Sequence, residues 1–282
     1  MTTSINIVAM VRRAYQEHWA LGQFNMSNLE TLQGIVDAAN ETRSPVIVGV
    51  SMGTLRHVGW SYLKGFIQAA RAEATTPLYF HVDHALDLPT IESAIEIGFD
   101  SVMIDTSRYP LDQNVAAVRK VVAIAHRRGV GVEAQIGETW DEESGEQVQT
   151  RTDPSQVEEF VAATGVDYLA VSFGNTPGSL VGEADVDVRL LREIATHSPV
   201  PIVIHGGTSI PAPILSEAIQ SGAAKVNIDT AIRKAVTKVL STQYGVPEVP
   251  TDPRKAFKLA REEVRKVVIE RMTLFGSVGR AN

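Results

Sequence analysis

Ionisable side chains gather in residues 78–107, whose spacing predicts a strand, a helix and a second strand. Polar and apolar residues alternate up to Asp83, Asp87 opens a helical run, and a short apolar segment then ends at Asp105. In parallel α/β folds the carboxyl ends of the strands form the edge where ligands bind. We therefore expect Asp83, His84 and Asp105 at a binding site. Polar caps and loop residues are the alternative interpretation, which recurrence of the pattern along the chain disfavours.

Two histidines suggest metal chemistry at this edge. His84 and His205 follow different predicted strands and could share a divalent ion with a carboxylate or a third imidazole. Asp83 would then be placed as a general acid/base, and the metal as a Lewis acid for an enolate, as carbon–carbon cleavage beside a carbonyl requires. A Schiff-base lysine is the other route. We expect Lys225 to begin its strand, at the wrong end of the fold, so metal is favoured.

Two loops have the composition of an anion site. Residues 205–209 (HGGTS) place two glycines and two hydroxyls before a predicted helix, and residues 227–230 (NIDT) open the next helix. In a (β/α)₈ barrel the loops after the seventh and eighth strands frequently hold a phosphate. A phosphate site is therefore predicted there.

The elements that must position these residues alternate between strands and helices. A long helix is predicted over Asp252–Met272, and the acidic segment Glu138–Asp153 has neither period and is predicted to be a loop. Eight strand candidates are found: 21–25, 45–50, 78–83, 101–104, 131–137, 168–172, 201–205 and 225–229. Their number predicts a single (β/α)₈ TIM barrel domain over residues 1–282 with an extra C-terminal helix. An open doubly wound sheet is the alternative.

Composition restricts the class of protein. The 282 residues are 44% hydrophobic and 21% charged, as in an ordinary globular protein, and the net charge of −7 disfavours a nucleic-acid partner. No apolar run reaches the roughly 18–20 residues that span a bilayer, and we find no signal-peptide pattern. The chain has no cysteine, which excludes disulfides and thiolate metal sites and fits a cytoplasmic protein.

Ten motifs, in order, resemble one family. They are GQFNMSNLE, SPVIVGVS, HVDHA, GFDSVMIDTS, GVEAQIGE, SFGNTPG, VIHGGTSIP, KVNIDT, DPRKAF and RMTLFGSVGRA. They are similar to those of the class II, metal-dependent ketose-bisphosphate aldolases, which act on fructose or tagatose bisphosphate. The resemblance implies a barrel that is usually dimeric or tetrameric. It also implies reversible cleavage of a ketose bisphosphate to dihydroxyacetone phosphate and an aldehyde through a metal-bound enediolate.

The resemblance also implies a role for particular residues. Asp83 would transfer the proton, with Glu143 as the glutamate of a mobile loop. His84 and His205 would bind zinc, and Asp105 would support the metal site. Arg254 matches a basic residue near the second phosphate. The residues expected around the dihydroxyacetone-phosphate end are Ser51, Gly178, Gly206, Gly207, Thr208, Asn227, Asp229 and Thr230, to which we add Asn25 from its place after the first strand.

Three departures from the family pattern lie in the predicted metal region. Pro177-Gly178 stands where the family has His-Gly, so the third zinc-binding imidazole is absent. Glu133-Ala134-Gln135 replaces Glu-x-Glu, and Trp140-Asp141 replaces a Gly-Gly pair. Two imidazoles make a poor zinc site, and the possible substitutes are Asn175, Gln135, Glu133, Asp105 and His81. The phosphate motifs remain, which favours altered chemistry or altered metal use over loss of function.

The sequence therefore predicts a lyase that cleaves a phosphorylated ketose, with a divalent metal, zinc first, as cofactor. A metal-poor isomerase or epimerase is one alternative, and a non-catalytic sugar-phosphate-binding paralogue is another. We expect a small phosphorylated sugar as partner, no nucleic acid or membrane, and a homodimer or homotetramer.

Overall fold

The strands close into a barrel, as predicted. The computed structural model describes residues 5–138, 150–176, 185–248 and 251–282. Each strand pairs in parallel with the next along the chain, and β8 pairs with β1, which rules out an open sheet. The strands are β1 (Leu21–Asn25), β2 (Val46–Ser51), β3 (Leu78–Ala85), β4 (Ser101–Ile104), β5 (Gly131–Ile136), β6 (Tyr168–Val171), β7 (Ile202–Ile204) and β8 (Ala223–Ile228).

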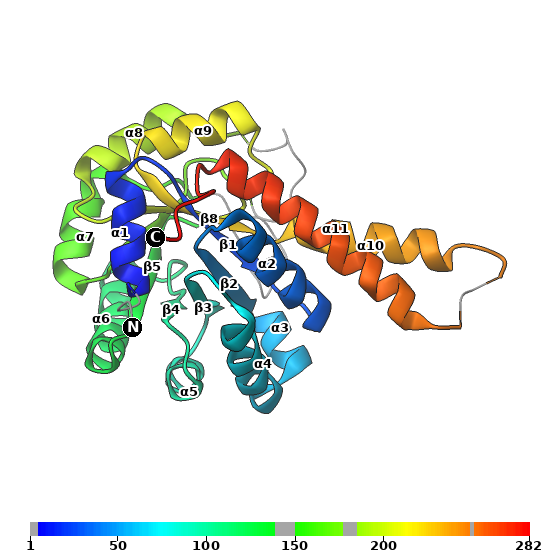
Figure 1. The fold of residues 1–282 in the computed structure, drawn as a ribbon. Coiled ribbons are helices and arrows are strands. Elements are labelled where there is room, and N and C mark those ends of the chain that lie inside the picture. The colour runs from blue at the N-terminus through cyan, green and yellow to red at the C-terminus, as the bar shows by residue number, and fades with distance from the viewer. Residues whose placement is uncertain (1–4, 139–149, 177–184, 249–250) are drawn as a thin grey trace.

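Helices cover the outside of the barrel (Figure 1). The α-helices of the described residues are α1 (Ile7–Gln16), α2 (Leu29–Thr42), α3 (Met52–Val58), α4 (Trp60–Glu73), α5 (Leu88–Ile97), α6 (Leu111–Ala125), α7 (Val157–Thr164), α8 (Val188–His197), α9 (Ala212–Gln220), α10 (Thr230–Tyr244) and α11 (Pro253–Leu274). Two short 3₁₀ helices are η1 (His126–Arg128) and η2 (Pro154–Gln156). None of the helices described is both long enough and apolar enough to cross a lipid bilayer.

Apolar residues fill two separate layers. The larger core lies between the strands and the surrounding helices and explains why the strands read as continuous apolar runs. A smaller core joins Ile7, Met10 and Val11 of α1 to residues near the beginning of the strands, such as Leu21 and Tyr79. Helix α1 therefore closes the amino-terminal end of the barrel and leaves the carboxyl end as the face for chemistry. The sequence pattern had not indicated α1 or α3.

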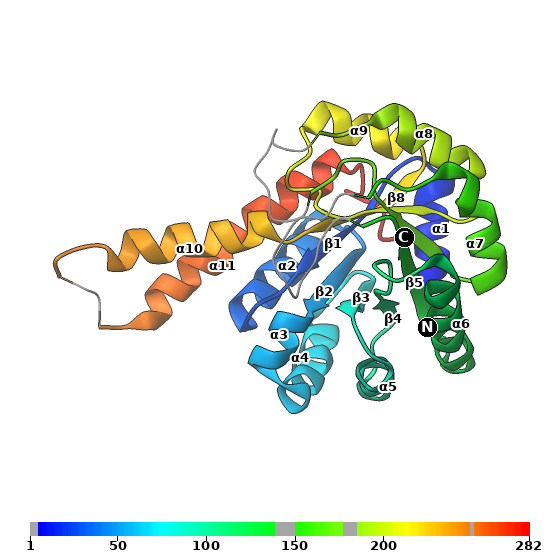
Figure 2. The same ribbon diagram turned by 180° about the vertical axis from the view of Figure 1, so that it is seen from behind.

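Helices α10 and α11 form a pair that extends away from the barrel, as both ribbon views show (Figures 1 and 2). Helix α11, the predicted C-terminal helix, packs against α10 and α2. Helix α10 runs from Thr230 to Tyr244. The beginning of α11 lies at the outer end of this pair, far from the strands (Figure 1).

Candidate active site

Asp83, His84 and His205 come together at the carboxyl end of the barrel. Asp83 and His84 belong to β3, and His205 directly follows β7. One ligand atom from each lies within 4.8 Å of the others. Nδ1 of His205 is 2.8 Å from Nε2 of His84, and Oδ1 of Asp83 is 3.9 Å from the same Nε2 atom. Sequence reasoning predicted that these three residues would meet, and the structure places them so.

An irregularity in β3 turns two consecutive side chains toward this site. Successive side chains of a regular strand point to opposite faces. Here the pairing of β3 with β4 changes register between Val82 and Ala85, and His84 has a φ of 53°, in the left-handed region that non-glycine residues seldom adopt. Asp83 and His84 can therefore both face the mouth of the barrel. A strained backbone at such a position is a feature often found at functional sites.

Each imidazole is supported by a carboxylate on the nitrogen that faces away from the other imidazole. Nδ1 of His84 is 2.6 Å from Oδ2 of Asp105, and we call these two residues the rim pair. Nε2 of His205 is 2.6 Å from Oε1 of Glu133, whose Oε2 lies 2.8 Å from Nζ of Lys225, and we call these three residues the interior chain. Because a carboxylate accepts, each supported nitrogen carries the proton. In the neutral form of each imidazole, a lone pair is therefore left on the nitrogen that faces the other ring.

This donor set fits a divalent metal. Two lone pairs at 2.8 Å repel unless a proton or a cation lies between them, and an imidazole backed by a carboxylate is the usual arrangement of a metal-binding histidine. Asp83 supplies a third donor within reach. The residues that would hold the metal are thus His84 and His205, with the Asp83 carboxylate beside them.

The site carries an excess of negative charge. Burial would lower the pKa of His84, but Asp83 and Asp105 outweigh burial and raise it to about 9. Burial would raise the pKa of Asp105, but the hydrogen bond and charge of His84 hold it at about 2. Burial likewise opposes ionisation of Glu133, but Lys225 and His205 keep its pKa far below the ordinary value. A site of this charge attracts a cation.

Asp83 is held as an ionised base. Its Oδ2 accepts from Nδ2 of Asn25 at 2.9 Å and its Oδ1 from Nδ2 of Asn227 at 3.4 Å. Burial would raise its pKa, but the imidazoles of His84 and His205 outweigh burial and lower the pKa to about 2. Two amide donors thus fix a carboxylate that can take a proton from a ligand.

The position predicted for Lys225 was wrong. Strand β8 begins at Ala223, so Lys225 is its third residue and its side chain lies fully buried inside the barrel. Its Nζ atom donates to Oδ1 of Asn227 at 2.7 Å and pairs with Glu133. Lysine was sought only at strand ends, whereas the long side chain of Lys225 reaches the site from the interior of the barrel. The shared face of Lys225 and Asn227, two residues apart, is the signal that could have indicated this.

The two predicted phosphate loops lie side by side. The N–H of Gly207 donates to the carbonyl of Asn227 at 3.0 Å, and the N–H of Ala231 donates to Oγ1 of Thr208 at 3.3 Å. Gly206 has a φ of 67°, which favours glycine, and a Cβ on Gly207 would lie 2.5 Å from a methyl carbon of Val226, so close packing favours glycine there. The two loops thus form one surface. The N–H groups of Gly207 and Ala231 are used to hold the loops together.

The other predicted binding residues differ in their distance from the mouth. Ser51 ends β2 beside Asp83 and caps α3, accepting from the N–H of Thr54 at 3.2 Å. Asp229 precedes Thr230, the first residue of α10, and burial raises its pKa to about 6 against the opposing effect of Arg233.

Arg254 is highly exposed, pairs with Asp252 and belongs to the outer beginning of α11, so this chain does not bring it to the mouth.

The side chains suggested as substitutes for the missing histidine have other partners. Asp105 and Glu133 contact the far nitrogens of the two imidazoles. The Asn175 amide donates to the carbonyl of His205, Gln135 donates to the carbonyl of Gly137, and Nδ1 of His81 contacts Ser101. Glu143, Trp140, Asp141, Pro177 and Gly178 lie outside the described residues.

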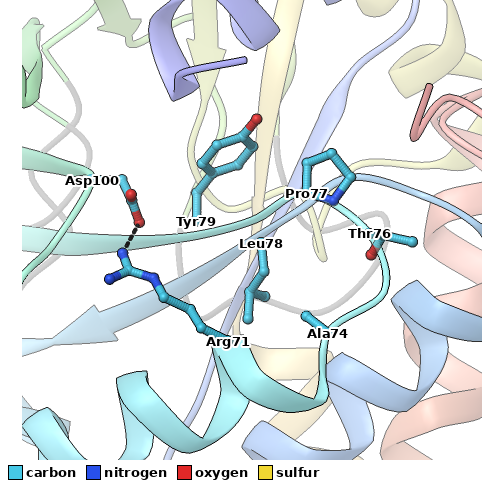
Figure 3. Close-up of a pocket in the computed structure, with 7 residues that line it drawn as sticks. All are labelled: Arg71, Ala74, Thr76, Pro77, Leu78, Tyr79 and Asp100. Carbon is cyan, nitrogen blue, oxygen red and sulfur yellow. Dashed lines mark hydrogen bonds and ion pairs between the residues drawn. The ribbon is translucent and has the colours of Figure 1, made fainter. Parts of the chain in front are cut away.

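A hollow lies at the opposite end of β3 from the candidate active site (Figure 3). This cavity of about 220 Å³ is lined by Arg71, Thr76, Tyr79, Asp100 and neighbouring residues. Its two charged residues, Arg71 and Asp100, pair with each other at 2.8 Å. Asp100 also accepts from the backbone N–H of Phe80. The charges here satisfy one another, so the hollow offers no reactive group.

Comparison with known proteins agrees with the geometry. The family model described as "Fructose-bisphosphate aldolase class-II" matches residues 5–280. The chain is 36% identical to the probable fructose-bisphosphate aldolase of Bacillus subtilis, over 98% of this chain and 99% of that protein. It is 37% identical to the fructose-bisphosphate aldolase of Geobacillus stearothermophilus, over 98% of each. The crystal structure of the YdjI aldolase from Escherichia coli superposes with a TM-score of 0.88 at 28% identity, over 99% of this chain and 100% of that one. The chain therefore belongs to the class II fructose-bisphosphate aldolase family.

Proposed function

We propose that this chain cleaves a phosphorylated ketose to dihydroxyacetone phosphate and an aldehyde, in the presence of a divalent metal. The observation that carries this proposal is the pair of imidazoles whose nitrogens Nε2 of His84 and Nδ1 of His205 face each other at 2.8 Å beside the Asp83 carboxylate, while a carboxylate backs the other nitrogen of each ring. The relatives named as fructose-bisphosphate aldolases make fructose 1,6-bisphosphate the first substrate to test. Within the described residues, nothing favours the isomerase or the binding-protein alternative.

Asp83 is the group that moves the proton. It takes the proton from the hydroxyl on the carbon beyond the bond that breaks, so that this carbon becomes the carbonyl of the released aldehyde. The electron pair of the broken carbon–carbon bond passes to the three-carbon phosphate half, which becomes an enediolate and then receives on carbon the proton that Asp83 took up. Asn25 and Asn227 keep the carboxylate in position during both steps. We also propose Glu143 as a second acid/base.

The metal we propose is zinc, held by His84 and His205 with the Asp83 carboxylate beside it. A bound zinc ion would supply Lewis-acid stabilisation of the negative charge that develops on the carbonyl oxygen. Asp105 and Glu133 fix the tautomers that leave His84 Nε2 and His205 Nδ1 available.

We propose that the phosphate end of the substrate lies over the two adjoining loops. Gly206, Gly207 and Thr208 supply one side, and Thr230 at the amino terminus of α10 supplies the other, where a helix favours negative charge. Ser51, Asp229 and Gly178 complete the proposed contacts.

The protruding position of Arg254 fits a homodimer or homotetramer in which another copy receives this side chain. Replacing Arg254 with alanine should then raise KM for a bisphosphate without changing the oligomeric mass measured by light scattering.

The experiment that tests the function measures cleavage of fructose 1,6-bisphosphate and metal content together. Zinc-loaded protein should release dihydroxyacetone phosphate, and removal of metal with a chelator should abolish release, with recovery on addition of zinc. A protein that binds zinc but cleaves no ketose phosphate would contradict the proposal. Solvent-proton exchange into dihydroxyacetone phosphate would then identify an isomerase-like activity.

Restoring an imidazole provides a sharper test of the metal site. The variant Pro177→His should bind zinc about tenfold or more tightly, because a third imidazole completes the set of protein donors that zinc prefers. The affinity is measured by competition with a chromogenic chelator. Unchanged zinc affinity would show that residue 177 does not face the metal.

A further inference from the structure

Lys225 joins the two halves of the candidate active site from inside the barrel. Its ammonium group is fully buried and contacts two side chains on different strands, Glu133 of β5 and Asn227 of β8. Strands β5 and β8 are not neighbours in the closed sheet, so the contact with Glu133 crosses the barrel interior. A buried lysine needs such partners, because removing an ammonium group from water is strongly unfavourable.

One contact determines how Asn227 faces Asp83. An amide has a donor end and an acceptor end, and Oδ1 of Asn227 accepts from Nζ of Lys225 at 2.7 Å. The donor end, Nδ2, is therefore turned toward Oδ1 of Asp83, 3.4 Å away. Without the ammonium group only the long 3.4 Å contact with Asp83 would favour this orientation, and a flipped amide would place an oxygen against the carboxylate.

The other contact holds Glu133 against His205. Oε2 of Glu133 lies 2.8 Å from Nζ of Lys225, an ion-pair contact, and its Oε1 is 2.6 Å from Nε2 of His205. With one oxygen held by the ammonium group, the other is fixed as the acceptor for the imidazole. This keeps the proton on Nε2 and the lone pair on Nδ1, which faces His84.

We propose that Lys225 is a positioning residue for both the metal ligand and the proton-transfer group. Through Glu133 it sets which nitrogen of His205 faces the metal. Through Asn227 it sets the orientation of Asp83. The part that concerns turnover rests on the proposed function, whereas the part that concerns zinc affinity does not.

The first test replaces the ammonium group with a methyl thioether of similar length. Lys225→Met should bind zinc about 10–100-fold more weakly, the usual loss when the support of a metal-binding histidine is removed. Its kcat should fall about 100-fold with KM changed less than about threefold, because the reacting groups are displaced while the phosphate loops are intact. Lys64→Met, the same change on the exposed face of α4, should leave both values unchanged. Wild-type zinc affinity in Lys225→Met would overturn the proposal.

The second test separates positioning from simple compensation of a buried charge. Glu133→Gln leaves the Lys225 ammonium group without its carboxylate, so adding Lys225→Met to this variant should raise the melting temperature. The same addition should lower kcat at least about tenfold further, because Asn227 then loses its donor. Stability and turnover thus move in opposite directions. A double variant with higher stability and undiminished kcat would overturn the role through Asn227.

These outcomes remain informative when one protein fails. If Lys225→Met alone does not fold, the comparison of Glu133→Gln with the double variant decides. If the unaltered protein cleaves no ketose phosphate, the proposed function fails, but the zinc affinities of Lys225→Met and Lys64→Met still decide whether Lys225 orders the metal ligands.

Discussion

The rim pair and the interior chain perform the same task in different surroundings. In the rim pair, the side chains of His84 and Asp105 are 23% and 14% exposed. The second oxygen of Asp105 accepts a hydrogen bond from the hydroxyl of Ser107 at 2.7 Å. In the interior chain, His205 and Glu133 are almost completely buried, and the second oxygen of Glu133 pairs with the ammonium group of Lys225. A carboxylate near water is satisfied by a neutral hydroxyl, whereas one removed from water is matched by a full positive charge.

This difference shows what each half of the site contributes. A partly exposed ion pair contributes little to stability because solvent screens it, whereas breaking a buried pair leaves an uncompensated charge in a medium of low polarity. The interior chain therefore ties metal binding to the stability of the barrel. The rim pair can be altered with less consequence, and its histidine is the one placed by an irregular strand.

The largest effect is expected at Asp83, where the two halves meet. Asp83→Asn should lower kcat about 10²–10⁴-fold, the usual contribution of a general acid/base, while the affinity for dihydroxyacetone phosphate remains nearly the same. Stopped-flow turnover and calorimetric ligand binding measure the two quantities. An equally active Asp83→Asn protein would remove Asp83 from the mechanism, because it would show that this carboxylate does not take the proton of the substrate.

The second prediction sets the two supporting carboxylates against each other. Glu133→Gln should reduce zinc affinity about 100-fold and Asp105→Asn about tenfold, within the range for support of metal-binding histidines. Glu133→Gln should also lower the free energy of unfolding by about 3–5 kcal/mol, because Lys225 is left unpaired, whereas Asp105→Asn should lower it by about 1 kcal/mol. Chelator competition and denaturant unfolding give these values. Equal losses in the two variants would contradict the distinction between rim and interior.

Much of the barrel could be predicted from the chain, because apolar runs and helical periods record which faces are buried. Seven of the eight strands begin within one residue of the expected position, and the eighth, β8, begins two residues earlier. That small error mattered, because it placed Lys225 at the strand start instead of beneath the reaction centre. A boundary is poorly recorded in composition where alanine, as at 223 and 224, is compatible with either side.

The meeting of Asp83, His84 and His205 was also predictable, since strand ends of a parallel barrel converge. The carboxylates that support the two histidines were less predictable. Glu133 was considered as a substitute ligand, but sequence cannot show which nitrogen of an imidazole a carboxylate will contact. The register change after Val82, which lets consecutive residues both face the mouth, has no marker such as glycine in the strand.

The third prediction concerns the pH dependence of the rim pair in metal-free protein. The pKa of His84 is raised to about 9 from an ordinary 6.5, so its protonated form stabilises the folded state fully below pH 6.5. This contribution is lost as the pH rises to 9, and amounts to roughly 3 kcal/mol at about 1.4 kcal/mol for each pH unit between the two values. The charge of Asp83 is the largest of the effects that raise the His84 pKa, which is why Asp105→Asn alone removes only part of this contribution.

Denaturant unfolding in the presence of a chelator, at pH 6.5 and at pH 9, measures this loss. His84→Gln, which has no titrating group at this position, should show a much smaller change over the same interval. Saturation with zinc should also suppress it, because a metal that occupies Nε2 replaces the proton. A metal-free protein whose unfolding free energy is the same at both pH values would show that the charge of His84 is not held by Asp83 and Asp105.

The smallest effect is expected at Ser107, the counterpart of Lys225 in the rim pair. Ser107→Ala removes the hydroxyl that donates to Asp105 but retains the backbone N–H, which donates to the same carboxylate oxygen at 3.2 Å. Water can also reach Asp105, so the lost hydrogen bond should be replaced and the free energy of unfolding should fall by no more than about 1 kcal/mol. Zinc affinity should change less than about fivefold, far below the loss expected for Lys225→Met. If Ser107→Ala weakens zinc as strongly as Lys225→Met does, water does not substitute at the rim, and the two supports are equivalent after all.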